Sequence, residues 1–328
     1  MWNYLKLIRV QNLFFILLIQ WMIIQFIIVP LLQINGIDNY GSFSLYILLT
    51  TATILTAAGG YVLNDYFDLK IDAINKPEKQ LVGRFIPKQK AMLLYQVLTI
   101  TGIIAGISLA WLLGSFTLAL IFIATPGLLW FYSASYKRQL IIGNIIVAFL
   151  AGLSVFIVGI TEMVILQNKF GFLIFETEIP QQIYGWTGGF AFFAFLLTWI
   201  REIIKDMEDI QGDRELECRT MPIVWGIQKS KFFIWTLIFS TIILLFATSI
   251  YLIPFKGTVT LKYLIYGIVL PLVALSYLTY KAKKPYDYHQ ASTLTKFIML
   301  TGLLYTFIVY YMLAKTYGIS MFNIFTVQ

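Results

Sequence analysis

The sequence predicts an all-α membrane protein, a bundle of about nine transmembrane helices. Hydrophobic residues make up 59% of the 328 residues, and charged residues only 12%, about half the share found in soluble proteins. Long apolar runs recur along the chain and are separated by short polar connectors. Because no long polar stretch interrupts this pattern, we expect one transmembrane domain that covers residues 1–328.

Each apolar run is expected to be a helix, because backbone polar groups inside a bilayer must hydrogen-bond within their own segment. The first run is too long for a signal peptide, and no small-residue cleavage site follows it, so it is interpreted as the first span. The stretch 163–186 is expected to form the longest external loop. The expected spans cover residues 13–34, 43–63, 91–113, 115–131, 140–162, 187–204, 232–254, 261–280 and 297–317.

The distribution of basic residues predicts the orientation of the chain. With a cytoplasmic N-terminus, nine spans place 20 of the 24 Lys and Arg residues on the cytoplasmic side, as the positive-inside rule requires. The net charge of +8 therefore reflects topology and not nucleic-acid binding. We expect a multi-pass protein of a bacterial inner membrane, with its active site on the cytoplasmic side. The single cysteine, Cys218, excludes an intrachain disulfide and a cysteine-based metal cluster.

Negative charge is concentrated in two segments between the apolar runs. Of the 16 acidic residues, 11 lie within residues 64–90 and 201–231. Carboxylates near a bilayer are energetically costly, and those that occur there are usually functional. In the orientation above, both segments lie on the cytoplasmic face. Because clustered carboxylates repel one another, we expect a cation between them.

The first segment carries Asn64, Asp68 and Asp72 at intervals of four residues. This spacing places the three side chains on one face of a helix. Asp65 points away from that face and is a candidate for orienting or deprotonating a second substrate.

The second segment repeats this spacing with Asp209 and Asp213, and Asp206 lies three residues before Asp209. Mg²⁺ prefers oxygen ligands and usually combines one or two carboxylates with substrate phosphates. Two such helix ends facing each other are therefore suited to magnesium ions that bridge a diphosphate. An alternative is that the acids are solvated helix ends or partners of nearby lysines.

Basic residues beside the two acidic segments are candidates for binding the diphosphate. Arg and Lys side chains both suit phosphate oxygens, although each of these residues taken alone is also typical of a positive-inside anchor. The candidates are Lys76, Lys79 and Arg84 after the first segment, Lys137 and Arg138 beside Tyr132, and Arg201 and Lys205 around the start of the second.

At these residues the sequence resembles the UbiA family of intramembrane aromatic prenyltransferases, and specifically its hydroxybenzoate and prenylglyceryl-phosphate branch. The family's first motif, Asn-x-x-x-Asp-x-x-x-Asp, and its second, Asp-x-x-x-Asp, both match. A Tyr followed by a Lys at the end of the fourth span, and an N-terminal Arg-x-x-Asn, also match. The segment after the first motif departs from the common Arg-Pro pattern. The matching residues are Asn64, Asp68, Asp72, Asp209, Asp213, Tyr132, Lys137, Arg9 and Asn12.

The resemblance implies a bundle around a central cavity that is capped on the cytoplasmic side. It implies Mg²⁺-dependent transfer of an isoprenyl group, for example from geranylgeranyl diphosphate, to a quinone-precursor aromatic compound or a prenylglyceryl phosphate. Asp65, Tyr132 and Lys137 would then be catalytic. The metal ligands would be Asp68, Asp72, Asp206, Asp209 and Asp213. The diphosphate would be bound by Asn64, Lys79, Arg84, Arg138, Lys205 and Arg9.

Two other functions compete with this interpretation. A CDP-alcohol phosphatidyltransferase also uses repeated aspartates and magnesium, but its single-cluster signature is absent from this sequence. A divalent-cation channel or transporter would use the acids as an ion site, although such sites normally lie near the membrane midplane on interrupted helices. Inhibition by a pyrophosphate analogue separates the cases, because a prenyltransferase is sensitive to it and a channel is not.

Overall fold

The computed structural model describes residues 2–37, 41–75, 77–251, 253, 258–322 and 325–326. Nine helical segments of this described part are long and apolar enough to cross a membrane, which confirms the predicted number of spans. They are Val10–Ile34 (α2, Val10–Ile23, and α3, Val29–Ile34), Phe43–Phe67 (α4), Lys88–Leu112 (α6), Phe116–Ala134 (α7), Ile142–Glu176 (α8, Ile142–Phe170), Ile179–Glu208 (α9), Ile227–Tyr251 (α12), Val259–Lys281 (α13, Val259–Tyr263, and α14, Leu270–Lys281) and Pro285–Tyr317 (α15).

Shorter elements connect these helices. Three are short 3₁₀ segments, and two very short strands pair antiparallel near the C-terminus. The short helices are α1 (Trp2–Leu7), α5 (Leu69–Asn75), α10 (Ile210–Glu215) and α11 (Met221–Val224), the 3₁₀ segments are Pro77–Lys79, Tyr136–Arg138 and Gly171–Glu176, and the strands are β1 (Ser320–Met321) and β2 (Phe325–Thr326).

The stretch 163–186, expected to be a long external loop, is mostly helical, so this prediction was wrong. Helix α8 continues to Phe170, and α9 begins at Ile179. Ile165 and Ile183 are buried in the main core. Polar residues are scattered through this stretch and interrupt its apolar pattern in the sequence. In the structure, apolar faces of the two helices pack against each other.

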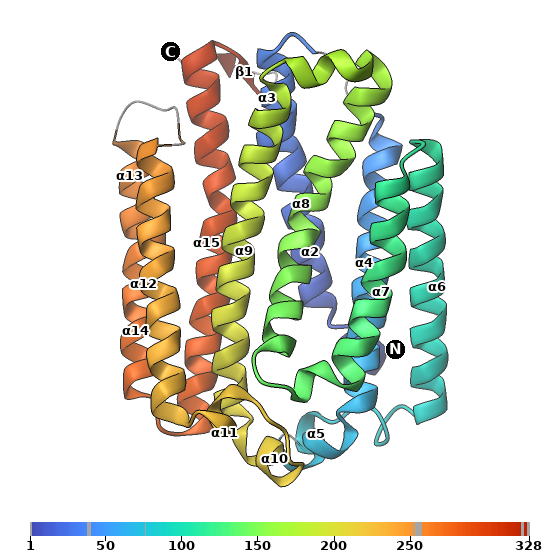
Figure 1. Ribbon diagram of the computed structural model, residues 1–328, viewed down its shortest axis with the longest axis vertical. Coiled ribbons are helices and arrows are strands. Elements are labelled where there is room, and N and C mark those ends of the chain that lie inside the picture. The colour runs from blue at the N-terminus through green and yellow to red at the C-terminus, as the bar shows by residue number, and fades with distance from the viewer. Residues whose placement is uncertain are drawn as a thin grey trace.

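The helices stand side by side, and the short helices α5, α10 and α11 lie together at one end of the bundle (Figure 1). Helices α4, α6 and α7 form one side, α12 and α14 form the other, and α9 and α15 lie between them. Small residues allow α4 and α6 to approach closely. A Cβ atom on Gly102 would lie 3.0 Å from the backbone nitrogen of Thr56.

Two membrane helices contain a wide π-helical turn that ends two residues before a proline. The turns cover Ile24–Ile28 and Leu264–Val269, and the prolines are Pro30 and Pro271. Proline has no backbone N–H, and its ring collides with the carbonyl group one turn earlier, so the preceding turn widens.

The largest buried core fills the half of the bundle away from α5 and α10. Leu49, Leu109, Leu166 and Val309 belong to it, and each is fully buried. On the side towards α5 and α10, one face of α4 lines an open cavity from Thr53 to Asp65. The core therefore packs away from the acidic segments, while the cavity passes beside it along α9, from Glu178 to Asp209.

Candidate active site

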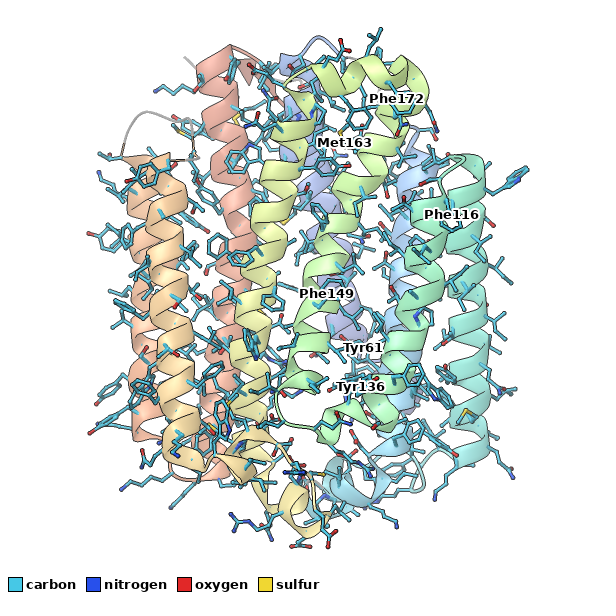
Figure 2. The ribbon with its side chains drawn as sticks, viewed as in Figure 1. Tyr61, Phe116, Tyr136, Phe149, Met163 and Phe172 are labelled. Atoms are coloured by element: carbon cyan, nitrogen blue, oxygen red, sulfur yellow. The ribbon has the colours of Figure 1, made fainter. Side chains whose placement is uncertain are left out.

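A cavity of about 2090 Å³ runs along the inside of the bundle, lined by α9 from Glu178 to Asp209. Its wall is polar near α5 and α10, where Asn64 and Asp68 line it, and apolar deeper in the bundle, where Ile23 and Phe190 line it. Figure 2 shows Tyr61, which also lines the cavity, near the α5 and α10 end. The cavity thus joins a charged mouth to an apolar interior.

The first motif lies where α4 ends and α5 begins. The helix breaks at Asp68, but the Asp72 amide still donates a hydrogen bond to the Asp68 carbonyl, at 2.8 Å. The three motif residues therefore remain on one face despite the break in the helix. The Asp68 carboxylate is nearly buried, and it accepts a hydrogen bond from Asn64 Nδ2 at 2.7 Å. It also forms an ion pair with the Lys137 ammonium group.

The second motif has the same design. Asp209 ends α9, and the Asp213 amide donates to its carbonyl at 3.2 Å across the start of α10. Thr220 Oγ1 donates to Asp213 at 3.4 Å. Asn144 Nδ2 donates to Asp206 Oδ2 at 2.9 Å. Each motif thus consists of a helix end followed by a short helix that carries the next aspartate.

A single side chain, Asn75, ties the two motifs together. Its Nδ2 donates to the Asp209 carbonyl at 3.0 Å, and its Oδ1 accepts from the Gly212 amide at 2.8 Å. A Cβ atom on residue 212 would lie 2.7 Å from both polar atoms of the Asn75 amide. Glycine at this position therefore permits the close approach of α5 and α10.

Between the motifs lies a small polar pocket of about 60 Å³. Carboxylates from both motifs line it, and the larger cavity shares Asp72 and Asp209 with it. The pocket-lining members of the predicted site are Asp72, Tyr132, Lys137, Arg138, Lys205, Asp206, Asp209 and Asp213. Residues 140 positions apart in sequence therefore share one pocket, as the paired motifs predicted.

The donor set of this pocket fits a hard divalent cation. Its side chains supply carboxylate oxygens, which Mg²⁺ prefers, and Mg²⁺ usually fills the rest of its shell with water and substrate phosphates. Among the described residues, no group of three His, Cys, Asp or Glu side chains forms a complete metal site. Instead Lys137 Nζ lies among the acids, in contact with Asp68 and 3.2 Å from Asn64 Oδ1. A positive charge is thus already accommodated there.

The electrostatics of the short helices reflect crowded carboxylates. Burial, together with the charges of Asp68 and Asp65, raises the pKa of Asp72 to about 6. Burial and the charge of Asp209 raise the pKa of Asp213 to about 6. Burial would lower the pKa of Lys137, but the nearby Asp68 carboxylate raises it above its ordinary value. The site therefore favours bound cations.

Arg9 and Lys205 each form an ion pair with an acidic side chain that lines the cavity. Arg9 Nη2 donates to Asp65 Oδ1 at 2.7 Å, and its guanidinium stacks over Tyr61 on the cavity wall. Lys205 Nζ lies 2.9 Å from Glu202 Oε2.

Three predicted cations lack an observed place in the site. Arg84 is exposed, donates to the Pro77 carbonyl at 3.2 Å and lines neither the cavity nor the pocket. The Lys79 side chain and Lys76 lie outside the described part of the chain.

Four polar residues near the site were missed from the sequence as site residues. Asn75 joins the motifs, Asn144 bonds to Asp206, and Glu202 binds both Arg201 and Lys205. Lys296 lines the cavity from α15. For Asn144 and Glu202, a polar residue inside an otherwise apolar expected span was the available signal. Asn75 and Lys296 lay in expected connectors and gave no such signal.

The fold and the paired motifs define a class: a multi-pass membrane protein whose carboxylate pocket lies at the mouth of a lipid-sized cavity. The chain belongs to the UbiA prenyltransferase family, whose model matches residues 28–301. This confirms the resemblance that the motifs indicated.

Curated relatives include archaeal proteins named digeranylgeranylglyceryl phosphate synthase. The one from Methanothermobacter thermautotrophicus is 34% identical over 191 residues, which cover 58% of this chain and 59% of that protein. The one from Sulfurisphaera tokodaii is 31% identical over 229 residues, or 70% of this chain and 73% of that protein. These relatives give the expected bacterial origin no support.

Solved structures share the fold. A digeranylgeranylglyceryl phosphate synthase is 23% identical, with a TM-score of 0.58, and the match covers 93% of this chain and 98% of that one. A UbiA homolog from Aeropyrum pernix K1 is 15% identical, with a TM-score of 0.61, covering 88% and 96%. A UbiA homolog from Archaeoglobus fulgidus, solved with GPP and Mg²⁺, is 14% identical, with a TM-score of 0.55, covering 93% and 99%.

Proposed function

We propose that the protein is a Mg²⁺-dependent prenyltransferase that adds a second geranylgeranyl group to a prenylglyceryl phosphate. The observation that carries this proposal is the junction of two carboxylate motifs with a cavity of about 2090 Å³. Pockets for small molecules are typically about 300–1,000 Å³. The larger volume favours two lipid substrates over one lipid and a small aromatic acceptor. The names of the curated relatives support the same acceptor.

The chemistry follows from the charges at the cavity mouth. The bond between the allylic carbon and the diphosphate oxygen breaks, and its electrons leave with the diphosphate. Bound Mg²⁺ would neutralise that leaving group and would be held by Asp68, Asp72, Asp209 and Asp213, with Asp206 beside them. The acceptor hydroxyl oxygen then bonds to the allylic carbon and releases its proton.

Residues of this chain have distinct roles in that reaction. Lys137, Tyr132 and Arg138 line the pocket between the motifs, where they can contact diphosphate oxygens. Asn64 fixes the Asp68 carboxylate. Asp65 lines the cavity and pairs with Arg9, and it would accept the proton of the acceptor hydroxyl. The apolar interior excludes water from the allylic cation.

An acceptor screen tests the proposed reaction. Purified protein in nanodiscs receives Mg²⁺, geranylgeranyl diphosphate and one acceptor, and products are identified by mass spectrometry. We expect a product heavier by one geranylgeranyl unit with geranylgeranylglyceryl phosphate. A product with hydroxybenzoate alone would contradict the acceptor assignment. Folded protein that releases no diphosphate with any acceptor would contradict the reaction class.

The Asn75 bridge is expected to be needed for joint action of the motifs. Replacing Asn75 with alanine removes both contacts to the second motif, so we expect transfer to fall about 10- to 100-fold, because misplacing reacting groups by about 1 Å is costly. Half-saturation by Mg²⁺ should require more metal. The measurement is initial rate against Mg²⁺ concentration.

Gln80→Ala is the matched control for Asn75→Ala. Gln80 is an amide in the same connector, and its Nε2 bonds to the Leu69 carbonyl at 3.1 Å and not to the second motif. Equal losses in both variants would show that Asn75 only stabilises the connector.

Magnesium is expected to stabilise the protein more at neutral than at acidic pH. The pKa values of Asp72 and Asp213 are raised to about 6 in the folded protein. Protonation of these carboxyl groups therefore stabilises the metal-free fold, and this stabilisation is lost as the pH rises from about 4 through 6. Mg²⁺ binds the ionised form, so its effect on Tm should be large at about pH 7.5 and small at about pH 5. A pH-independent Tm increase would contradict metal binding by these carboxylates.

A further inference from the structure

A second group of charged residues lines the same cavity, deeper in the membrane than the carboxylate motifs. Arg201 precedes Asp209 by eight residues on α9, so it lies roughly 12 Å further into the bundle. Lys296 lies on α15, eleven residues after the helix begins at Pro285, or roughly 16 Å from that end. Both residues line the cavity, and α9 and α15 pack against each other (Figure 1).

Positive charge exceeds negative charge on this wall. Glu202 accepts hydrogen bonds from Arg201 Nη1 at 3.0 Å and from Lys205 Nζ at 2.9 Å, and so it is shared by two cations. Lys296 makes no hydrogen bond or ion pair with any residue that the structure describes. The positive charges of Arg201, Lys205 and Arg9 and the negative charge of Glu202 are all close enough to act on its ammonium group, so three cations face one carboxylate. Arg9 has its own partner, Asp65.

Two sets of donors are left without an acceptor. The Nε atom of Arg201 is buried and has no hydrogen-bond partner among the described residues. The Lys296 ammonium offers three donors to the cavity, and the buried residue Ser292 lies one turn before it on the same wall. An uncompensated cation at membrane depth is costly. The arrangement is therefore suited to an anion with several oxygens, such as a phosphate group.

We propose that Arg201 and Lys296 bind the phosphate group of the acceptor, a prenylglyceryl phosphate; this rests on the function proposed above. The donor diphosphate belongs to the carboxylate end, and its allylic carbon extends from there into the cavity. The acceptor hydroxyl must approach that carbon from the interior. Its phosphate, attached to the adjacent carbon of the glycerol, then falls within reach of Arg201 and Lys296. Specificity for a phosphorylated acceptor follows from the same two cations.

Steady-state kinetics of Lys296→Gln, which removes the charge and keeps a polar side chain, test this assignment. We expect KM for geranylgeranylglyceryl phosphate to rise on the order of 10- to 100-fold, with KM for geranylgeranyl diphosphate unchanged. With geranylgeranylglycerol, which lacks the phosphate, the variant and the unmodified protein should have equal kcat/KM. Arg201→Gln should show the same pattern.

Lys315→Gln is the control, because Lys315 is an exposed residue on the same helix that does not line the cavity. It should leave both KM values unchanged. A Lys296→Gln enzyme with unchanged KM for the acceptor would overturn the assignment. A rise in KM for geranylgeranyl diphosphate alone would also overturn it, because the cations would then bind the donor.

Binding without turnover separates this assignment from the proposed function. Geranylgeranylglyceryl phosphate should raise the Tm of the unmodified protein more than geranylgeranylglycerol does, and this difference should disappear in Lys296→Gln. If the unmodified protein binds the phosphate ester in this way but forms no ether product, the proposed reaction fails while the phosphate subsite stands. Equal Tm shifts by both compounds overturn the subsite.

Discussion

Replacing Asp68 or Asp209 with alanine is expected to reduce prenyl transfer about 1,000-fold while the protein still inserts and folds. Asp68 ends α4 and Asp209 ends α9, and both line the cavity mouth. Each carboxylate would hold the metal that neutralises the departing diphosphate. Loss of one ligand should cost about 4 kcal/mol of transition-state stabilisation, equivalent to about 1,000-fold in rate. Diphosphate release and product mass measure the loss.

Glu215→Gln is the matched control for these variants. Glu215 is the last residue of α10, is exposed, and lines neither the cavity nor the small pocket. The Glu215→Gln variant should keep nearly full activity. Each variant should also yield about as much folded protein as the unmodified chain. Near-normal transfer by Asp68→Ala or Asp209→Ala would refute the metal assignment.

Replacing Lys137 with glutamine is expected to destabilise the metal-free protein and to make its stability strongly dependent on Mg²⁺. The Lys137 ammonium group is in contact with Asp68, whose side chain is only 5% exposed. Removing one partner of a fully buried pair costs about 3–5 kcal/mol. Since the Lys137 side chain is 30% exposed, we expect about 2–3 kcal/mol. Transfer should also fall about 100-fold or more, because a cation for the leaving group is lost.

Thermal unfolding with and without Mg²⁺ tests the Lys137 prediction. Mg²⁺ should restore most of the lost Tm in Lys137→Gln, because it replaces the missing positive charge among the carboxylates. Lys229→Gln, which removes an exposed lysine at the start of α12, should behave like the unmodified protein in both conditions. An equal Tm loss that Mg²⁺ leaves unchanged would show that Lys137 stabilises the fold by packing alone.

Much of the fold was predictable because the bilayer is a simple solvent. A helix must be apolar over its whole length to cross it, so hydrophobic runs alone predicted nine spans, and the described part of the chain contains nine. Most boundaries shifted by a few residues, but the last helix begins at Pro285, 12 residues before its expected start at residue 297. The error at 163–186 arose where α8 and α9 bury each other's apolar faces, because neither face is continuous in sequence.

The motif residues were also predictable, because spacing along a helix determines which side chains share a face. The intervals between Asn64, Asp68 and Asp72 indicated one face, and the backbone hydrogen bond across the break after Phe67 preserves it. Asn75 differs, since its importance comes from contacts with Asp209 and Gly212. A local sequence pattern does not reveal a contact between residues more than 130 positions apart.

The sequence by itself determined the membrane class, the number of spans and the residues of the two carboxylate motifs. These properties depend on local composition and spacing, which the chain carries in any arrangement. Only the tertiary structure decided which helix ends meet, how large the cavity is, and that Arg201 and Lys296 line it from neighbouring helices. Those properties arise from packing between distant segments. Packing brings together charged residues that no local sequence pattern connects.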